Sequence, residues 1–398
     1  MTNKHYLALS AISLQAFGAG VSGIAILFAA TNIAEVTGAT VVVACSLAGV
    51  ALGGLSVGAI AHLLSTQRVL LISEVIRVLC VLCLFVFDLE LPWLGLLALG
   101  LSLVSSVSNA NRWDILFKSP AYNNENIYNI QQAEIIAGIL SPLAAGYITG
   151  VHGVNCAYLS SLIILSFGCL AWFVFCSKIT TFSKPKSNHF YGYAIIFQSK
   201  QLSSLILLRI LTGSSMVIWS VYLPVVLRAM YGNDFPSFQG ELAAMSAIAV
   251  ALSGFLMRND SEKQWTLQRF VFIAAISMFM HGLSMSIFVG MFRSYWVLCL
   301  AALAFGCYVP TIRASIVHIG KIATPADSVS EVVSAGDSMV RVVNFLISIS
   351  FGLLLSLFKS DNERAALFFT MTTISTLAVL ALRNLITSPD IRCAKPPY

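Results

Sequence analysis

The amino-acid sequence predicts an all-α, polytopic membrane protein with twelve transmembrane helices in two bundles of six. Of its 398 residues, 58% are hydrophobic and only 10% are charged, whereas a soluble domain carries about a quarter charged residues. A chain with so little polar surface cannot enclose a water-soluble globule, so a soluble enzyme is excluded. The charges are also mostly crowded into short breaks between long apolar runs, which is typical of a membrane protein with many crossings.

Twelve apolar runs are long enough to cross a bilayer. A hydrocarbon core of about 30 Å requires roughly 20 helical residues per crossing, because backbone polar groups must be satisfied within the segment. The predicted crossings are 6–32, 39–64, 69–88, 92–117, 127–150 and 155–177, then 202–228, 239–258, 268–290, 295–317, 331–358 and 364–385. We expect an N-terminal bundle over 1–178, a cytoplasmic linker over 179–201, and a C-terminal bundle with a short cytoplasmic tail over 202–398.

Basic residues set the orientation, since Lys and Arg beside the crossings are retained on the cytoplasmic side. With both termini inside, 15 of the 23 basic residues lie in cytoplasmic segments and four lie outside. We therefore expect a multi-pass protein of the inner (plasma) membrane with both termini cytoplasmic. This topology explains the net charge of +6, so no nucleic-acid partner is expected.

No removable leader and no metal site are predicted. The N-terminal segment lacks the small-residue cleavage site of a secretory signal and is expected to be the first permanent crossing. The nine cysteines lie mainly in apolar runs, where cysteine usually packs as a small hydrophobic side chain. We therefore expect no metal and no cofactor.

Three predicted crossings of the first half carry charges. Glu74 and Arg77, three residues apart near the start of the third crossing, are expected to form a local ion pair. Arg112 ends the fourth crossing, close to the cytoplasmic boundary. Glu134 lies about 10 Å into the fifth crossing, has no basic residue one turn away, and is the candidate proton carrier. The alternative is a structural carboxylate tied to the helix of Arg112 or Arg77.

The second half carries three deep charges. Arg209 has no acidic residue within four positions. It is expected to bind an anionic group of the substrate or to pair across helices with Glu134 or Asp337. Asp337 and Arg341 share one helical face and are expected to form an ion pair. This pair is either structural, or it breaks when Asp337 takes up a proton and so frees Arg341 for an anionic group. Because each charge at helix-centre depth costs roughly 2.5–3.5 kcal/mol, these groups should face water or one another.

The charges recur between the halves. Arg112 and Arg313 are 201 residues apart, Glu134 follows Arg112 by 22 residues, and Asp337 follows Arg313 by 24. Duplicated halves are common in transporters. Three more polar or aromatic residues are expected to line a cavity, although such side chains more often contribute to helix packing: Gln15, Trp219 and Tyr222.

Two motifs resemble those of the major facilitator superfamily. Between crossings two and three, the chain reads Gly58-Ala-Ile-Ala-His62-Leu-Leu-Ser-Thr-Gln-Arg68, which resembles the superfamily's loop signature, with His62 at its acidic position. Crossing five carries Gly138-Ile-Leu-Ser-Pro142-Leu-Ala-Ala-Gly146, which is similar to the glycine–proline motif of its antiporters. The stretch 97–159 looks like the siderophore and drug exporters related to the enterobactin exporter.

The resemblance implies two bundles around a central cavity and alternating access driven by proton exchange. The first crossing has no embedded acid, unlike many cation exporters, so an anionic or zwitterionic substrate is expected. Conformational or gating roles are assigned to nine residues: Gly58, His62, Arg68, Glu74, Arg77, Arg112, Arg313, Pro142 and Gly146.

The sequence thus predicts a proton-coupled exporter of a small amphipathic compound, such as a siderophore or peptide-like antibiotic. Glu134 and Asp337 are expected to carry protons, and Arg209 and Arg341 to bind the substrate. Proton-coupled import is the alternative. A lipid-handling membrane enzyme would need a reactive His, Ser or Asp constellation, and a sensor would need a soluble module; neither is found in the sequence. One chain holds a complete cavity, so a monomer is expected.

Overall fold

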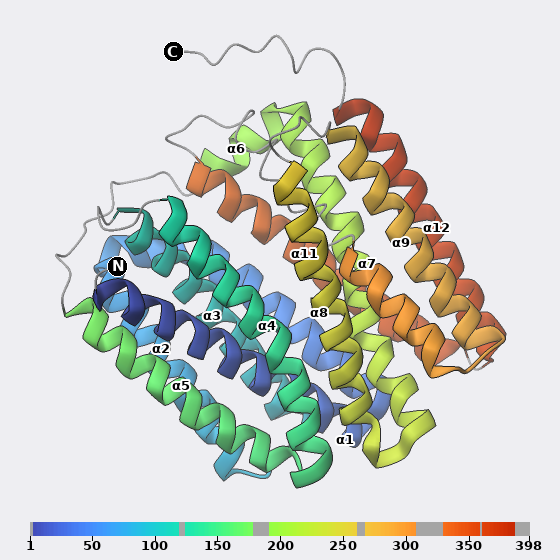
Figure 1. The fold of residues 1–398 in the computed structure, drawn as a ribbon, viewed down its shortest axis with the longest axis horizontal. Coiled ribbons are helices and arrows are strands. Elements are labelled where there is room, and N and C mark those ends of the chain that lie inside the picture. The colour runs from blue at the N-terminus through green and yellow to red at the C-terminus, as the bar shows by residue number, and fades with distance from the viewer. Residues whose placement is uncertain are drawn as a thin grey trace. The chain divides into compact units, whose positions relative to one another are not determined.

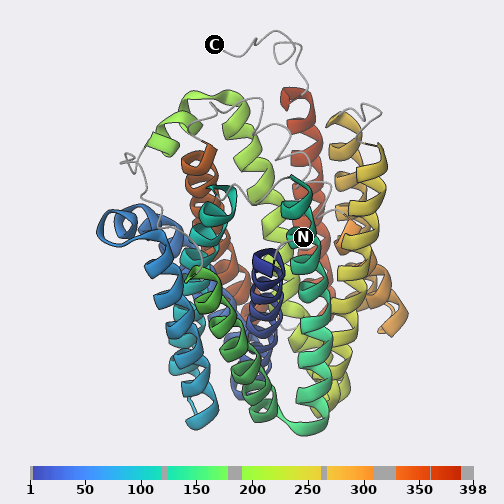
Figure 2. The same cartoon turned by 60° about the vertical axis from the view of Figure 1, so that its left-hand side comes forward.

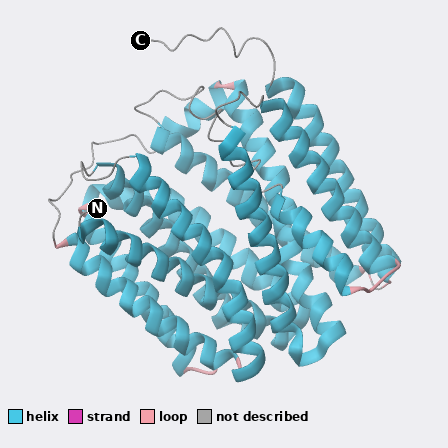
Figure 3. Ribbon diagram, viewed as in Figure 1, coloured by secondary structure: helices cyan, strands magenta, loops and turns pink. Residues whose placement is uncertain are grey.

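The computed structural model describes residues 3–118, 124–177, 191–260, 267–307, 329–358 and 360–386. Over these ranges the chain is helical and contains no strand (Figure 3). Helix occupies the described part of every predicted crossing. Eight helical stretches are long and apolar enough to span a membrane, and two of them, Tyr6–Ser56 and Leu202–Ser253, are 51 and 52 residues long. Each of these two is about twice as long as one crossing requires. The predicted all-α, multi-pass architecture is confirmed.

The chain divides into two compact units (Figure 1). The first comprises Met1–His189 and Ser220–Ala244, and the second comprises Phe190–Trp219 and Met245–Tyr398. The first unit contains α1 (Asn3–Leu63), α2 (Thr66–Val86), α3 (Leu91–Lys118), α4 (Asn124–His152), α5 (Val154–Cys176), the end of α7 (Lys200–Tyr231), η1 (Gly232–Asp234) and the start of α8 (Phe235–Asp260). The second contains α6 (Tyr191–Gln198), the rest of α7 and α8, α9 (Leu267–Gly290), the helix Tyr295–Cys307, α11 (Val329–Leu357) and α12 (Asp361–Ile386).

The long helix α1 consists of two arms joined at a kink. Ala34 and Glu35 leave helical geometry, with φ of −144° and +43°. Gly38 then lies so close to Ala30 that a Cβ at Gly38 would collide with the Ala30 carbonyl oxygen. Such an approach between residues eight apart requires the chain to turn sharply, since eight residues span about 12 Å of straight helix. The two arms correspond to the first two predicted crossings.

Small residues bring the α1 arms close to their neighbours. On the first arm, Gly18 accepts a hydrogen bond from Ser161 Oγ of α5 at 2.7 Å. Figure 2 shows this arm, in dark blue, beside α5, in green. On the second arm, a Cβ at Gly49 would lie 2.9 Å from the backbone nitrogen of Leu103 in α3. Without a side chain at Gly49, the backbones of α1 and α3 are able to touch.

The second unit packs by the same principle. Helix α9 lies against α12, where Gly282 leaves room for the side chain of Thr372. Leu205 of α7, Met278 of α9, Val340 of α11 and Val379 of α12 belong to one buried apolar cluster. The core of this unit therefore joins α7 and α9 to α11 and α12, which come much later in the sequence.

Apolar side chains also cover the outer faces of the helices. Leu79 on α2, Phe167 and Phe173 on α5, and Leu353 on α11 are all exposed. A soluble protein rarely exposes such large contiguous apolar surfaces. These helix faces are suited to contact with lipid tails, because every backbone polar group is satisfied within its own helix.

The Gly49 contact predicts a selective loss of stability. A leucine at Gly49 would force α1 away from the α3 backbone, and we expect a loss of about 2 kcal/mol from overpacking. The matched control is Gly138→Leu, because a Cβ at Gly138 meets no atom within 4 Å. Thermal unfolding in detergent should show a lower midpoint for Gly49→Leu and no loss for Gly138→Leu. Equal midpoints would contradict the close packing of α1 on α3.

Candidate functional site

A fully buried ion pair lies on α2. Glu74 and Arg77 are 1% and 5% exposed, and Arg77 Nη1 lies 2.9 Å from Glu74 Oε2. This is the local pair that the sequence predicts. The other carboxylate oxygen, Oε1, accepts a hydrogen bond from Ser108 Oγ of α3. Both oxygens of Glu74 are thus engaged, and the pair fixes α2 to α3.

A second ion pair joins α3 to α4. Arg112 Nη2 lies 2.8 Å from Glu134 Oε1 and also donates to Asn109 Oδ1. Arg112 is buried, whereas the side chain of Glu134 is 34% exposed. Of the two partners left open for Glu134, Arg112 is the one beside it. The Glu134 carboxylate is therefore paired with a buried arginine and is itself partly exposed.

The two pairs form one charge network. Arg112 interacts electrostatically with Glu74 and Arg77 as well as with Glu134. The network, defined as Glu74, Arg77, Arg112 and Glu134, has two positive and two negative groups and spans α2, α3 and α4. Its formal charge is zero, which lowers the cost of holding four ionised groups in apolar helices.

A cavity of about 140 Å³ lies beside this network. We call it the serine chamber, because four serines and Arg77 supply its polar lining. Its walls come from both arms of α1, from α2 and from α3: Ala19, Ser22, Gly23, Ile26, Val42, Ser46, Val50, Arg77, Ala98, Leu101, Ser102 and Ser105.

In the second unit, Arg209 of α7 pairs with Asp337 of α11. Arg209 Nη2 donates to Asp337 Oδ1. Arg209 lies nine residues after the start of α7, about 14 Å along the helix. The side chains of Arg209 and Asp337 are 22% and 47% exposed, so this pair is far more open than the pair on α2. Gly336 permits the approach of the two helices, since its Cβ would lie 2.6 Å from Ile206.

Helix α11 continues this polar site for several turns. Arg341 follows Asp337 by one turn and is exposed. Asn344 and Ser348 follow at helical spacing and are buried, and Asn344 Oδ1 and Ser348 Oγ have no hydrogen-bond partner in the described part. Gly213 of α7 lies directly against the Asn344 amide. The residues at 337, 341, 344 and 348 thus form a polar stripe on one face of α11.

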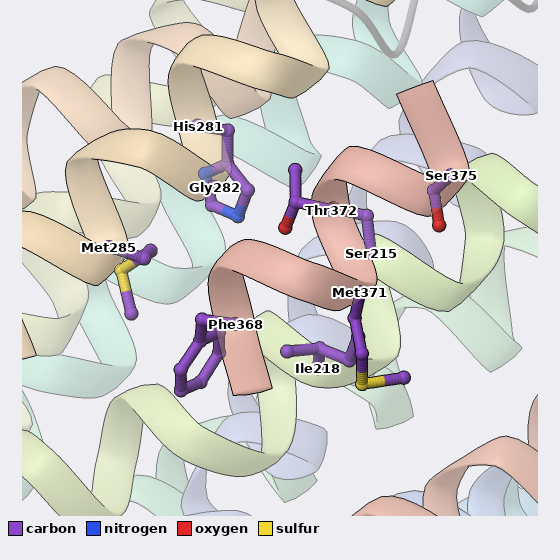
Figure 4. A pocket seen from close by; sticks show the side chains of 9 residues that line it. All are labelled: Ser215, Ile218, His281, Gly282, Met285, Phe368, Met371, Thr372 and Ser375. Atoms are coloured by element: carbon purple, nitrogen blue, oxygen red, sulfur yellow. The ribbon is translucent and has the colours of Figure 1, made fainter. Parts of the chain in front are cut away.

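Trp219 belongs to a buried aromatic cluster in the second unit. Its ring stacks on Phe305 with a centroid distance of 5.7 Å and meets His281 edge-on at 4.9 Å. His281 Nδ1 is 2.9 Å from the carbonyl oxygen of Ala301. Beside His281 is a cavity of about 10 Å³, into which Thr372 also points (Figure 4). This volume suits about one water molecule.

Gln15 and Tyr222 occupy tightly packed positions. The Gln15 Oε1 accepts a hydrogen bond from Trp172 Nε1 at 2.8 Å, which ties α1 to α5. Tyr222 is buried on α7. The substrate-binding role of both residues stays a prediction.

The residues of the glycine–proline motif lie where α4 approaches α8. Pro142 is inside α4, and a Cβ at Gly146 would lie 2.8 Å from the Cα of Gly240. Arg68 is exposed on α2. Gly58 and His62 lie in α1, but nothing further is described of these two positions. Arg313 lies outside the described residues. The gating roles of these residues remain predictions.

Sequence reasoning did not identify Ser108 and Asn109 as partners of the charged residues. Serine and asparagine in helices commonly bond to their own backbone, as Asn111 does to Val107 O, so residue type gives no signal. Their position on the charged face of α3, at 108, 109 and 112, is the only sequence hint. Within the described residues, no group of three or more His, Cys, Asp or Glu side chains could hold a metal ion.

Removing one member of the α2 pair should destabilise the protein strongly. Arg77→Ala leaves the buried Glu74 carboxylate without its counter-charge, and we expect a loss of about 3–5 kcal/mol. The double variant Glu74→Gln with Arg77→Gln should recover part of this loss, and Arg68→Ala, at an exposed position, serves as control. Urea unfolding in detergent measures all three. If Arg77→Ala behaved like Arg68→Ala, the ion pair would be unimportant for folding.

Comparison with known proteins identifies the fold. No protein-family model and no curated protein sequence matches the chain. Among solved structures, the nucleoside transporter NupG has a TM-score of 0.72 at 13% identity and covers 97% of this chain and 100% of its own. An auto-inhibited POT family peptide transporter has a TM-score of 0.71 at 12% identity, with 96% of both chains covered. A POT family transporter in complex with 5-aminolevulinic acid has a TM-score of 0.72 at 14% identity and covers 97% of this chain and 96% of its own. These structures show that the chain has the major facilitator fold. They do not test the narrower resemblance to siderophore exporters.

Proposed function

We propose that this protein is a secondary active transporter that exports a small anionic or zwitterionic solute in exchange for protons. The observation that carries the proposal is the partly exposed Arg209–Asp337 pair, deep in two apolar helices. The fold supports transport in general, since the solved structures that share it include nucleoside and peptide transporters.

The partial exposure of the Arg209–Asp337 pair favours a role in transport over a purely structural role. A structural pair should be fully buried with both carboxylate oxygens engaged, as they are in Glu74 beside Arg77. Asp337 is instead 47% exposed on its side chain and receives one described hydrogen bond, from Arg209. A proton on Asp337 would remove the counter-charge of Arg209. The arginine would then be available to an anionic group of the solute.

The Asp337 carboxylate and the anionic group of the solute therefore compete for Arg209, and protonation of Asp337 decides which of the two Arg209 holds. In the cycle we propose, Arg209 and Arg341 hold the anionic group in the inward-open state. After release outside, protons reach Asp337 and Glu134, and the neutralised carboxylates permit the return. Glu134 fits this role because Arg112 keeps its bond to Asn109 when the carboxylate is neutral. Gln15, Trp219 and Tyr222 stay candidate substrate-binding residues in this proposal.

Proton-coupled import is the second candidate, and the same ion pair could serve it. In symport, the solute anion would bind Arg209 while the proton binds Asp337, so both would occupy the site together. One of the solved structures is a complex with 5-aminolevulinic acid, a compound with an amino group and a carboxyl group. The two modes respond oppositely to an imposed pH gradient, so vesicle measurements distinguish them.

Neutralising the proton-binding carboxylates should uncouple transport from the proton gradient. We expect Asp337→Asn and Glu134→Gln to reduce gradient-driven transport of small zwitterionic solutes in proteoliposomes by at least about tenfold, which corresponds to roughly 1.4 kcal/mol of coupling. Solute exchange without a gradient should persist in both variants. The control is Asp88→Asn, at an exposed position after α2. Full gradient-driven transport by Asp337→Asn would remove this residue from the mechanism.

Replacing Arg209 should weaken solute binding in a graded way. Arg209→Lys keeps the charge and loses the planar fork, so it should bind the anion less well, while Arg209→Gln should bind it least. We expect the half-saturating solute concentration to rise by about tenfold for Arg209→Gln, the effect of losing roughly 1.4 kcal/mol. Lys200→Gln, at an exposed basic position on the same helix, is the matched control. Unchanged saturation of all variants would exclude Arg209 from the binding site.

A further inference from the structure

The side chain of Arg77 contributes the charged group in the wall of the serine chamber. A guanidinium carries five N–H donors and no acceptor, and Arg77 uses Nη1 for Glu74. The side chain is only 5% exposed and lines the chamber. An occupant of the chamber that offers an acceptor atom is therefore suited to the N–H groups that Glu74 does not bind.

Hydroxyl groups extend the polar wall beyond Arg77. Ser46 lies on the second arm of α1, and Ser102 and Ser105 lie on α3; all three are half-buried and line the chamber. Ser22 donates to the carbonyl oxygens of Gly18 and Ala19, so its lone pairs remain available. The remaining lining residues are apolar or glycine. The guanidinium of Arg77 can only donate, and the other three hydroxyls can donate as well, so these groups favour a ligand that carries oxygen acceptors.

The charge balance rules out a cationic occupant. The charged residue on the chamber wall is Arg77, and Glu74 directs its two oxygens to Arg77 and Ser108. No carboxylate is among the residues that line the chamber. A positively charged group would therefore face a guanidinium without a neutralising partner in the wall.

The volume limits the occupant to one small functional group. A cavity of 140 Å³ has room for several water molecules. Pockets for whole drug-sized ligands are about 300–1,000 Å³. Gly23 on the wall is exposed, and a Cβ there would meet no atom within 4 Å. The chamber therefore has free space at its α1 wall, through which the rest of a larger molecule could extend.

We propose that the serine chamber is a binding subsite inside the first unit for a carbonyl or carboxylate group, held by the Arg77 guanidinium and the serine hydroxyls. This inference rests on the proposed transport of a small solute and names the part of the chain that would recognise its oxygen-bearing end. It assigns Arg77 a binding role in addition to its ion pair with Glu74.

Cysteine labelling tests whether the chamber is accessible to water. In a variant with its nine native cysteines replaced, Ser102→Cys and Ser105→Cys should react with small methanethiosulfonates at least about tenfold faster than two controls, because only hydrated thiols ionise readily. Val81→Cys is the buried control and Leu79→Cys the control on an exposed apolar face, both on α2. Rates equal to those controls would overturn the proposal.

Protection by small probes tests the binding chemistry. Acetate and acetamide should slow the labelling of Ser102→Cys in purified protein, whereas tetramethylammonium, which has no acceptor, should not. Adding Arg77→Lys preserves the positive charge beside Glu74 but removes the planar set of guanidinium donors, and it should abolish protection. If that variant does not fold, Ser46→Ala with Ser105→Ala should weaken protection instead. Rapid labelling without protection by either oxygen-bearing probe would show a hydrated cavity without a subsite and would overturn the proposal.

Labelling is measured without any transport step, so the two proposals can fail separately. Protection in a protein that transports no solute would refute the proposed function and leave the subsite standing. Transport without protection would refute the subsite alone.

Discussion

The absence of water from the bilayer core governs where this chain can place a charge. Each ionised group taken out of water costs several kcal/mol, and only an opposite charge with good hydrogen bonds repays that cost. The three described ion pairs follow this constraint: Glu74 with Arg77, Arg112 with Glu134, and Arg209 with Asp337. Two of these pairs join different helices, α3 to α4 and α7 to α11. Pairing opposite charges thus lowers the cost of placing these residues in the bilayer. It also holds α3 beside α4 and α7 beside α11.

Close helix packing is the second requirement, because a short side chain such as that of Asp337 cannot reach across a wide gap. Lipid tails are as apolar as leucine, so helices associate through shape and polar contacts. Gly336, beside Asp337, lets α11 approach α7, and Gly213 of α7 lies against Asn344. Substituting larger side chains at these glycines would separate the helices that carry Arg209 and Asp337. The small residues therefore position the site without touching a solute.

The sequence predicts the crossings well, because hydropathy depends on composition along each segment and not on neighbouring helices. It also predicts the pair Glu74–Arg77, since spacing along one helix determines that contact. The partners of Glu134 and Arg209 could only be narrowed to two candidates each, because the rotation of each helix decides which faces meet. The serine chamber was not predicted, since serines are common in membrane helices and only the packing of α1 against α3 turns them toward one cavity. The role predicted for Gln15 stays a prediction; its described hydrogen bond is with Trp172.

The buried pair Glu74–Arg77 and the partly exposed pair Arg209–Asp337 differ in whether their carboxylate can take up a proton and so couple proton movement to transport. A proton on Glu74 would disrupt two buried contacts, to Arg77 and to Ser108. The packing of α2 against α3 would then lose stability. A proton on Asp337 would disrupt one described contact at a half-exposed position. The freed Arg209 remains partly exposed and can bind a new anion in place of the old one. Reversible protonation is therefore compatible with the fold at Asp337, whereas at Glu74 it would compete with folding itself.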